Sequence, residues 1–411
     1  MLVVLIYALV RNSDDATNAL SDLTRDTPLH SLFPDADPLR PDAVENPPFT
    51  SLSYGVQAFL WWNDGWSAGK HMDWVLMMQF THVKQSFPWR LLEPEPGVWV
   101  WDQADFIINE LEKRDLRIVA RLDQTPAWAL PDDLADREGF IDAPAEDLRN
   151  WQNYCGTLAE RYQGRIKAYQ IWNEPNLTRE WGSQPPDAAR YVELLRVCSE
   201  AIRAADPEAI IISAGLAPTG NLDALAMRDD IYLQQLYDHG FERYIDVVGV
   251  HAPGYSAPSY GTDDAERDGR QRWQSFRRVE DLRRIMVENG DAARQMAILE
   301  FGYTTDTQNP VYSWFAVTPE QQAEYIVDAY RYAAENWRPW VGLMSLIYIA
   351  NPVWTEENEE FWWALDNPVT FETRPAFAAV IQMEKYCGDI VLPARSPEET
   401  GGVPDEPNPC S

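Results

Sequence analysis

The chain has 411 residues, of which 45% are hydrophobic, and its formal net charge at pH 7 is −31, from 65 acidic and 34 basic residues. This apolar share is ordinary for a globular protein and excludes disorder for the body of the chain. A protein with this negative charge repels nucleic acid and anionic lipid, and neither is predicted as a partner. A neutral or cationic substrate fits this charge better than a polyanionic one.

The chain begins with ten apolar residues, MLVVLIYALV, followed by Arg11 and an Asp- and Pro-rich stretch. Ten residues are too few to cross a bilayer. They resemble the apolar core of a signal peptide or an anchor, but the basic leader and the small-residue cleavage site are missing, so a hydrophobic chain end stays open as an alternative. We interpret 1–49 as this apolar segment plus a linker, and we predict an extracellular or cell-surface location.

Eight short apolar runs follow, each trailed by a plausible helix. They begin near Tyr54, His82, Arg117, Lys167, Ala209, Asp246, Gln295 and Val341. Continuous apolar strands indicate a sheet buried on both faces, which is the parallel arrangement. Eight β–α units fit a closed barrel better than an open sheet, and no GxGxxG or GxxxxGK[ST] motif follows a strand. The predicted fold is α/β, a single (β/α)8 TIM barrel over 50–390 with disordered tails, the second spanning 391–411.

The helix predicted after 317 carries the clearest local signals. Thr318 is placed as its N-cap, Pro319 at its first position, and Gln321 completes a capping box. Apolar side chains then recur at i, i+3 and i+4 spacing as far as Trp337, which predicts one face packed on the barrel.

The four cysteines show no CxxC or zinc-type spacing. Cys155 and Cys198 fall in helical patterns and are interpreted as buried thiols. Cys387 and Cys410 could join the C-terminal tail to the barrel, although four cysteines allow three full pairings. The five His are scattered without an HxH or HExxH motif, so neither a metal nor another cofactor is predicted.

Two carboxylates stand out by their position on predicted strands. Glu174 ends the fourth strand, in YQIWNEPNL, and Glu300 ends the seventh, in AILEFGYTT. Barrel active sites lie at the C-terminal ends of the strands, and strands four and seven lie on roughly opposite sides of the mouth. A charge placed there costs desolvation unless it is paired or used. A purely structural role is a fair alternative for one such Glu, but a poor one for two that face each other.

Acetal hydrolysis requires such a pair. One carboxyl must be protonated to donate to the glycosidic oxygen, and the other must be ionised to attack or stabilise the anomeric carbon. The surroundings must therefore give the two groups different pKa values. Lys84, His251 and Tyr255 are the candidates that would keep Glu300 charged. Trp172 and Pro175 flank Glu174, which predicts an apolar setting that raises its pKa.

Three stretches carry a family resemblance. WNEPN at a strand end, Glu followed by Phe-Gly at a later strand end, and HVKQSFPWRLLEPEPGVWVWDQAD resemble the large clan of retaining glycoside hydrolases with (β/α)8 barrels. Within that clan the chain is most similar to the cellulase-like and β-xylosidase/α-L-iduronidase-like families. The stretch FWWALDNPVTFETRPAFAAV resembles the segment that follows strand eight in these families. The resemblance covers 54–385. It implies Glu174 as general acid/base and Glu300 as nucleophile, with Asn173 before the acid/base close enough to bond the sugar 2-hydroxyl.

The chain departs from the clan at two strand ends. Lys84 stands where the clan usually has Arg, which keeps the charge but not the bidentate fork. Asp123 stands where cellulase-like members often have His, which weakens a cellulase assignment. The resemblance implies that Trp354 forms the sugar platform after strand eight, with a core position as its alternative. Trp89 is a second candidate for the cleft, with core and cleft equally open.

The sequence therefore predicts a glycoside hydrolase that cleaves O-glycosidic bonds of an oligo- or polysaccharide with retention, and a carbohydrate is its predicted partner. Two alternatives are a transglycosylase and a non-catalytic carbohydrate-binding barrel. The second gives no reason to keep an opposed pair of buried carboxylates. A metal-assisted hydrolase does not fit the scattered His. The sugar, the linkage, internal or terminal cleavage and the oligomeric state do not follow from the sequence.

Overall fold

The computed structural model describes residues 44–135, 142–396, 402–404 and 406–410. The apolar N-terminal segment and most of the predicted linker lie outside these residues. Within them, no helix combines the length and the apolar character that a membrane span requires.

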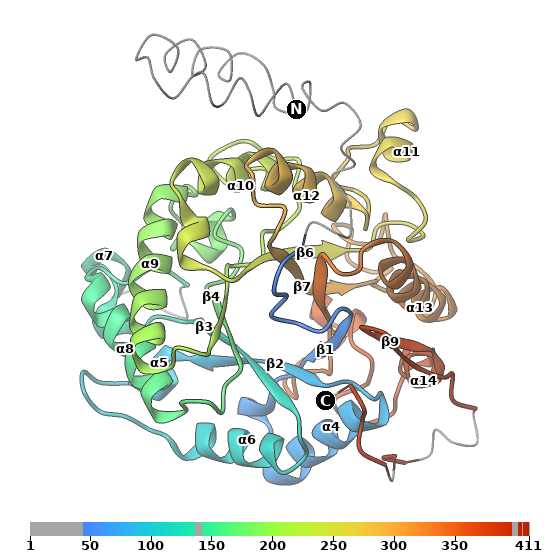
Figure 1. Cartoon of the computed structure of the whole chain (residues 1–411), viewed down its shortest axis with the longest axis horizontal. Coiled ribbons are helices and arrows are strands. Elements are labelled where there is room, and N and C mark those ends of the chain that lie inside the picture. Colours follow the sequence, from blue (N-terminus) through green and yellow to red (C-terminus); the bar gives the residue numbers. More distant parts are fainter. Residues whose placement is uncertain (1–43, 136–141, 397–401, 405, 411) are drawn as a thin grey trace, which may run out of the picture.

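Eight parallel strands close into a barrel in chain order, with β8 paired to β1 (Figure 1). Every strand begins within one residue of its predicted start, which confirms the (β/α)8 fold. The strands are β1 (Ser53–Gln57), β2 (His82–Pro88), β3 (Arg117–Asp123), β4 (Ala168–Ile171), β5 (Ile210–Ile212), β6 (Val247–Pro253), β7 (Gln295–Gly302) and β8 (Val341–Leu346).

Helices surround the barrel (Figure 1). The longer ones are α4 (Gly65–Met77), α6 (Asp102–Glu112), α8 (Leu148–Arg161), α9 (Ala188–Ala205), α10 (Asp229–Asp238), α12 (Arg278–Glu288), α13 (Pro319–Asn336) and α14 (Pro375–Gln382). The short ones are α5 (Trp89–Leu92), α7 (Asp132–Ala135) and α11 (Thr262–Arg267), and the 3-10 turns are η2 (Leu60–Trp62), η3 (Ala127–Ala129), η4 (Thr178–Glu180), η5 (Phe241–Tyr244) and η6 (Glu359–Trp362).

Helix α13 forms as its local signals predict. The Thr318 hydroxyl accepts a hydrogen bond from the backbone N–H of Gln321 at 3.2 Å, and the Gln321 side chain accepts from the N–H of Thr318 at 3.0 Å. Ile326 and Tyr330 on its apolar face are fully buried. The capping box thus fixes where the helix begins, and the apolar face fixes how it packs.

The closed end of the barrel extends the domain ahead of the predicted boundary at residue 50. Phe49 is buried among the first residues of the strands, including Val119 of β3 and Val247 of β6. The Gln295 side chain bonds both backbone groups of Phe49, accepting from its N–H at 3.0 Å and donating to its carbonyl at 3.1 Å. Phe49 therefore plugs the N-terminal end of the barrel and does not belong to the linker.

All four cysteines form disulfides, which corrects the interpretation of Cys155 and Cys198 and decides the pairing of Cys387 and Cys410. Cys155 of α8 and Cys198 of α9 form a disulfide with an S–S distance of 2.04 Å, so they are not free thiols. The two helices pack side by side, and this packing decides which of their residues meet. The sequence pattern of either helix alone does not reveal that pairing. Cys387 and Cys410 are also bonded, as one of the open pairings allowed.

The C-terminal segment is likewise tied to the barrel. A hairpin of β9 (Lys385–Cys387) and β10 (Ile390–Leu392) follows α14. The N–H of Leu52, just before β1, donates to the carbonyl of Tyr386 at 3.1 Å, and the N–H of Tyr386 donates to the hydroxyl of Tyr54 in β1 at 2.9 Å. The expected disorder from 391 onward is therefore wrong for β10 and for Cys410, which the hairpin and the disulfide hold.

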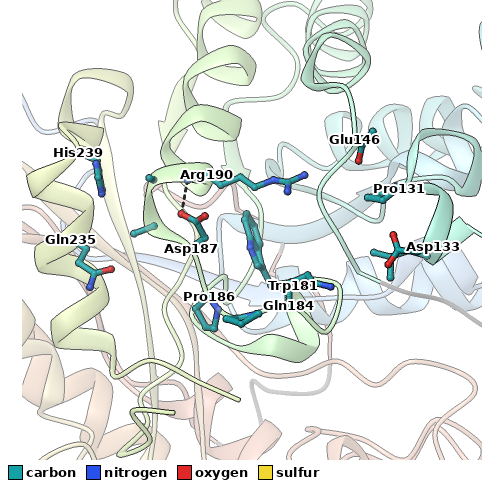
Figure 2. A pocket seen from close by; sticks show the side chains of 14 residues that line it. Pro131, Asp133, Glu146, Trp181, Gln184, Pro186, Asp187, Arg190, Gln235 and His239 are labelled. Atoms are coloured by element: carbon teal, nitrogen blue, oxygen red, sulfur yellow. Dashed lines mark hydrogen bonds between the residues drawn. The ribbon is translucent and has the colours of Figure 1, made fainter. Parts of the chain in front are cut away.

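A cavity of about 590 Å³ opens outside the barrel, where residues of α7, α9 and α10 meet (Figure 2). Trp181, Arg190 and His239 line it, and the Asp187 carboxylate at its edge accepts from the N–H of Arg190 at 3.0 Å. None of its lining residues belongs to the strand ends that carry the predicted carboxylates. The cavity is therefore separate from the predicted active site.

Candidate active site

The loop after β4 holds Glu174 in an uncommon backbone conformation. Trp172 and Glu174 have positive φ angles of 71° and 41°, which residues other than glycine seldom adopt. Backbone hydrogen bonds fix both, from the N–H of Trp172 to the Leu122 carbonyl at 2.9 Å and from the N–H of Glu174 to the Gly215 carbonyl at 3.0 Å. Such strain persists where the surroundings over-determine it, as is typical of functional sites.

Asn176 holds the same loop in place through its side-chain hydrogen bonds. Its side chain is fully buried and donates to the carbonyls of Ala217 at 2.8 Å and Met227 at 2.9 Å. Its amide oxygen also accepts from the N–H of Ala217 at 3.0 Å. The conformation that presents Glu174 is thus pinned to the segment after β5.

Glu300 on β7 is paired with Lys84 on β2, as predicted. The Lys84 Nζ lies 2.8 Å from the Glu300 Oε1 and 3.3 Å from the carbonyl oxygen of Leu299, and the lysine side chain is only 1% exposed. The Nη1 of Arg121 on β3 is 3.8 Å from the same carboxylate oxygen. Burial raises the pKa of Glu300, but the charges of His251, Lys84 and Arg121 outweigh burial and hold it below its ordinary value.

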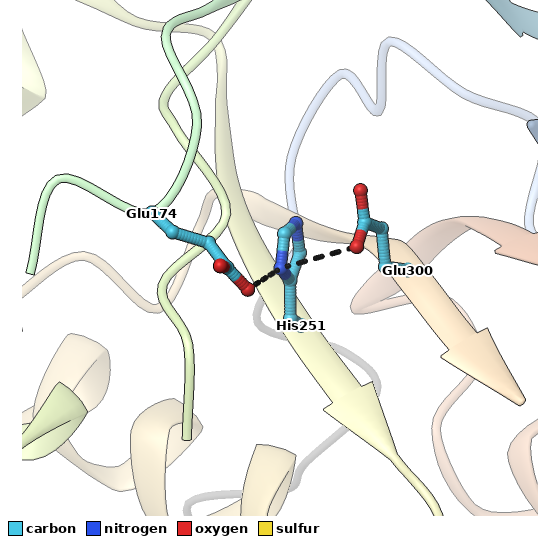
Figure 3. Close-up of side chains that lie close together, drawn as sticks. All are labelled: Glu174, His251 and Glu300. Atoms are coloured by element: carbon cyan, nitrogen blue, oxygen red, sulfur yellow. Dashed lines mark hydrogen bonds and ion pairs between the residues drawn. The ribbon is translucent and has the colours of Figure 1, made fainter. Parts of the chain in front are cut away.

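His251 lies between the two carboxylates (Figure 3). It is paired with Glu300 in the sheet register, next to an irregularity in β6. Its Nδ1 is 2.9 Å from the Glu174 Oε1 and 3.7 Å from the Glu300 Oε2. Only glycine fits at 215, because an added Cβ would come within 2.2 Å of the His251 ring.

The surroundings of Glu174 differ from the prediction. The indole of Trp172 turns into the core, where it packs against Trp151 and Trp181, so it does not supply an apolar wall for the carboxylate. Instead, Arg179 donates to the Glu174 Oε2 at 2.9 Å. Burial raises the pKa of Glu174, yet the hydrogen bond and charge of His251, joined by the charge of Arg179, lower it well below its usual range. The expected rise in the pKa of Glu174 is therefore wrong.

A third carboxyl, Glu180, was not predicted. Burial and then the charge of Glu174 raise its pKa to about 7, against the opposing charges of Arg121 and Arg179. The Arg179 Nε also lies 3.3 Å from the Glu180 Oε1. Arg121 and Arg179 were missed as well. The polar alternation in RIVARLD and the charges following WNEPN could have indicated them.

Three further residues predicted to bind substrate are Asn173, Tyr255 and Trp354, and each has different neighbours. Asn173 is 5% exposed and accepts from Gln170 at 3.1 Å. Tyr255 lies against Trp314, 5.8 Å away in a stacked arrangement. Trp354 is partly exposed beyond β8, with its ring centroid 5.1 Å from that of Tyr348.

Trp89 is a core residue. Its side chain is fully buried, stacks on Tyr154 with ring centroids 5.3 Å apart, and donates to the Glu93 carboxylate at 2.8 Å. The cleft role considered for it is therefore wrong. Its place right after Pro88, the last residue of β2, begins α5 and turns the indole inward toward α8.

The site also contains three atoms that could ligate a metal ion and that lie within 4.8 Å of one another. They come from Glu174, His251 and Glu300, and this is the single such group within the described parts of the chain. That spacing could hold a cation. The ammonium of Lys84 already lies against Glu300, however, and Arg121 adds a second positive charge there. These charges repel a divalent ion and favour a role for the carboxylates in acid–base and nucleophilic chemistry.

Comparisons with known proteins agree with this fold. No family model matches the chain. A curated relative, endo-1,4-beta-xylanase 2 of Claviceps purpurea, is 32% identical over 126 residues, which cover 28% of this chain and only 35% of the xylanase. A family 39 glycoside hydrolase from Bacteroides cellulosilyticus has a TM-score of 0.58 at 18% identity, covering 82% of this chain and 63% of that one.

A family 39 beta-xylosidase from Caulobacter crescentus has the same TM-score of 0.58 at 17% identity, over 84% of this chain and 75% of that chain. The resemblance to the clan of (β/α)8-barrel glycoside hydrolases is thus confirmed at the level of the fold. The chain spans only about a third of the length of this curated xylanase, so the activity and the substrate of the whole chain remain proposals.

Proposed function

We propose that this chain is a retaining O-glycoside hydrolase, with Glu300 as nucleophile and Glu174 as general acid/base. The observation that carries the proposal is the distance between the two carboxylates, because an oxygen of Glu174 lies within 4.8 Å of an oxygen of Glu300. Retaining enzymes have carboxyl groups about 5–5.5 Å apart, whereas inverting enzymes need about 6.5–9.5 Å to admit a water molecule. The spacing therefore supports double displacement.

In the first step a Glu300 oxygen attacks the anomeric carbon while Glu174, which must carry a proton when the bound substrate reacts, gives that proton to the departing glycosidic oxygen. In the second step Glu174 takes a proton from water, and that water releases the sugar from its ester with Glu300. The negative charge of Glu174 raises the pKa of Glu300, and two like charges act on each other in the same way, so forming the ester on Glu300 removes a charge that disfavours ionisation of Glu174. The pKa of Glu174 then falls, so this carboxyl stays ionised and can accept the proton of the water in the second step.

The substrate we propose is a neutral glycan with β-xylosidic bonds. The matched relative and the structural neighbour are a xylanase and a xylosidase by name, and the net charge of −31 disfavours a polyanionic chain. Transfer of the sugar to another hydroxyl would use the same glycosyl ester, so a transglycosylase remains the second candidate.

An activity screen with a stereochemical readout tests this function. Aryl β-xyloside, β-glucoside and α-arabinoside are assayed in parallel with xylan and a β-glucan, and the first anomer released is identified by proton NMR. We expect β-xylosides to be cleaved, with the β anomer appearing first. An α anomer first would contradict retention. Binding without any turnover would instead favour the non-catalytic carbohydrate-binding barrel.

Lys84→Met should shift the acidic limb of the pH profile. Lys84 favours the ionised form of Glu300, so its removal raises the pKa of that carboxyl, and more Glu300 is protonated at mildly acidic pH. We expect the acidic limb of kcat/KM to rise by about one unit, within the usual effect of a close charge, while the basic limb moves less. An unchanged acidic limb in a folded variant would contradict this role of Lys84.

We also propose that the protein is exported. The Cys155–Cys198 and Cys387–Cys410 disulfides support this, because such bonds persist in oxidising compartments and are rare in the cytosol.

A further inference from the structure

A single arginine joins the proposed acid/base to a third carboxyl group. The Nη2 of Arg179 donates to the Glu174 Oε2 at 2.9 Å, and its Nε lies 3.3 Å from the Glu180 Oε1. The Arg179 side chain is 66% exposed, whereas the side chains of Glu174 and Glu180 are 12% and 19% exposed. One cation near the surface is therefore shared between two carboxyl groups that are largely buried.

The backbone that carries Arg179 and Glu180 is held in place. The indole of Trp172 donates to the Glu180 carbonyl at 2.9 Å, and the N–H of Thr178 donates to the Leu225 carbonyl at 2.9 Å. An exposed side chain changes its rotamer rapidly while its backbone stays fixed. Arg179 can therefore change its partner by rotation of its own side chain, without a movement of the loop.

Both oxygens of the Glu174 carboxylate have a partner. Oε1 lies 2.9 Å from the Nδ1 of His251 (Figure 3), and Oε2 accepts from Arg179. His251 is 2% exposed, and its ring packs so closely on Gly215 that it cannot withdraw. Oε2 is therefore the oxygen that can turn to a glycosidic oxygen. A guanidinium group has only donors and favours an ionised carboxylate, so Arg179 opposes protonation of Glu174 for as long as it stays there.

The other cations near these carboxyl groups have fixed partners. Lys84 is 1% exposed and bound to Glu300, and Arg121 is paired with the buried Asp123. Further titratable groups feel the charges of this site: Glu180 acts on the pKa of Asp142, Glu174 on those of Tyr255 and Tyr348, and Arg179 on those of Tyr312 and Glu359. Arg179 is thus the cation of the described site that is free to move between two carboxyl groups.

Glu180 carries a proton under conditions where Glu174 does not. Burial and then the charge of Glu174 raise the pKa of Glu180 to about 7, whereas the pKa of Glu174 lies well below its usual range because His251 and Arg179 outweigh its burial. At mildly acidic pH the proton therefore resides on Glu180, although the first chemical step needs one on Glu174. If Arg179 turns to Glu180, it favours an anion there and withdraws its charge from Glu174.

We propose that Arg179 changes its partner from Glu174 to Glu180 when a sugar enters the site, and that this exchange protonates the acid/base. The Glu180 carboxyl releases its proton to water and the Glu174 carboxylate takes one up, so the total charge of the three side chains is unchanged. Arg179 and Glu180 are thus positioning residues for Glu174. The inference rests on the proposed function, and it names the residues that make Glu174 an acid when substrate is bound.

Glu180→Gln tests the exchange, because Arg179 then has no second anion and stays on Glu174. If the pKa of Glu174 in the complex falls by about one unit, its protonated fraction above that pKa falls about tenfold. We expect kcat on xylotetraose or cellotetraose, whichever is the better substrate, to fall roughly tenfold at neutral pH, with its basic limb at lower pH. Dinitrophenyl xyloside, which needs no acid, should be cleaved at nearly the wild-type rate.

The matched control is Glu160→Gln, which alters an exposed carboxylate on α8 and should change neither rate. Melting temperatures verify that each variant is folded. Equal losses on the tetraose and on the dinitrophenyl glycoside, or no loss on either, overturn the proposal.

Variants of Arg179 show whether Glu180 acts through it. Arg179→Met removes a cation from Glu174 and raises its pKa, so the basic limb of kcat/KM should move up by about one unit, whereas Arg179→Lys keeps the charge and should stay near the wild type. Glu180→Gln should cause little further loss in the Arg179→Met background. Losses that combine independently in the double variant overturn the proposal.

Crystal structures of Glu300→Gln with and without xylotetraose or cellotetraose separate the exchange from the proposed function. We expect Arg179 on Glu174 without the sugar and on Glu180 with it. A bound sugar with Arg179 still on Glu174 overturns the exchange and leaves the hydrolase standing. Arg179 on Glu180 in a protein whose wild type hydrolyses nothing supports the exchange and contradicts the hydrolase. A protein that neither binds nor cleaves these sugars overturns both.

Discussion

Glu300→Ala is expected to abolish turnover on every glycoside, including those with the best leaving groups. Without the carboxylate no glycosyl ester forms, and a fall in kcat of roughly 10⁴-fold or more is typical when a nucleophile is removed. Azide, added in excess, occupies the vacated space and attacks the anomeric carbon directly. Because this is one displacement, the glycosyl azide should have the inverted configuration, which NMR identifies.

Stability is the necessary control for this variant. Removing Glu300 leaves Lys84 buried without its carboxylate partner, and breaking a buried pair costs about 3–5 kcal/mol. The melting temperature should therefore fall in Glu300→Ala. Glu208→Ala alters an exposed carboxylate in the turn between α9 and β5, so it should leave activity and melting unchanged. A folded Glu300→Ala enzyme with wild-type kcat would eliminate Glu300 as the nucleophile.

Glu174→Ala should fail in a different way, because its proton matters only for poor leaving groups. Dinitrophenyl glycosides need no proton to depart, so their first step should proceed at a rate near that of the wild type. Unactivated oligosaccharides should lose roughly 10²–10⁴-fold, the usual contribution of a general acid or base. The second step also loses its base, so the glycosyl ester should accumulate and give a burst of dinitrophenol.

Azide distinguishes this variant from the first. It needs no base to attack the ester on Glu300, so it should restore steady-state turnover of Glu174→Ala and give an azide of retained configuration after two displacements. Equal losses on activated and unactivated substrates would contradict the acid/base role, as would an inverted azide.

Many residues of the candidate site can be predicted from the ends of the apolar strand segments in the sequence. The apolar runs mark each strand, and a charged residue that ends a buried run has to point into the mouth of a barrel. Glu174 and Glu300 were located in this way, and the 2.8 Å pair of Lys84 with Glu300 follows from the same logic.

What the sequence did not predict depends on packing between elements. Arg179 lies five residues after Glu174, and only the turn of η4 brings it back onto that carboxylate. Likewise, Cys155 and Cys198 meet because α8 lies along α9. Trp172 precedes Asn173 in the motif, yet its positive φ and core partners turn its ring away from Glu174. Neighbours in sequence were a poor guide to neighbours in space at these positions.

Both described ends of the chain are fastened to the same face of the barrel. The N–H of Glu45 bonds the Ala293 carbonyl just ahead of β7 at 3.0 Å, and Asn408 donates to the Gln79 carbonyl just ahead of β2 at 2.8 Å. Glu174 and Glu300 open on the opposite face. At Glu45 and Asn408 the described chain thus lies behind the face that carries the two carboxylates. A partner fused directly at residue 44 or residue 410 would therefore project away from the mouth of the barrel, and long polymer strands would remain free to enter it.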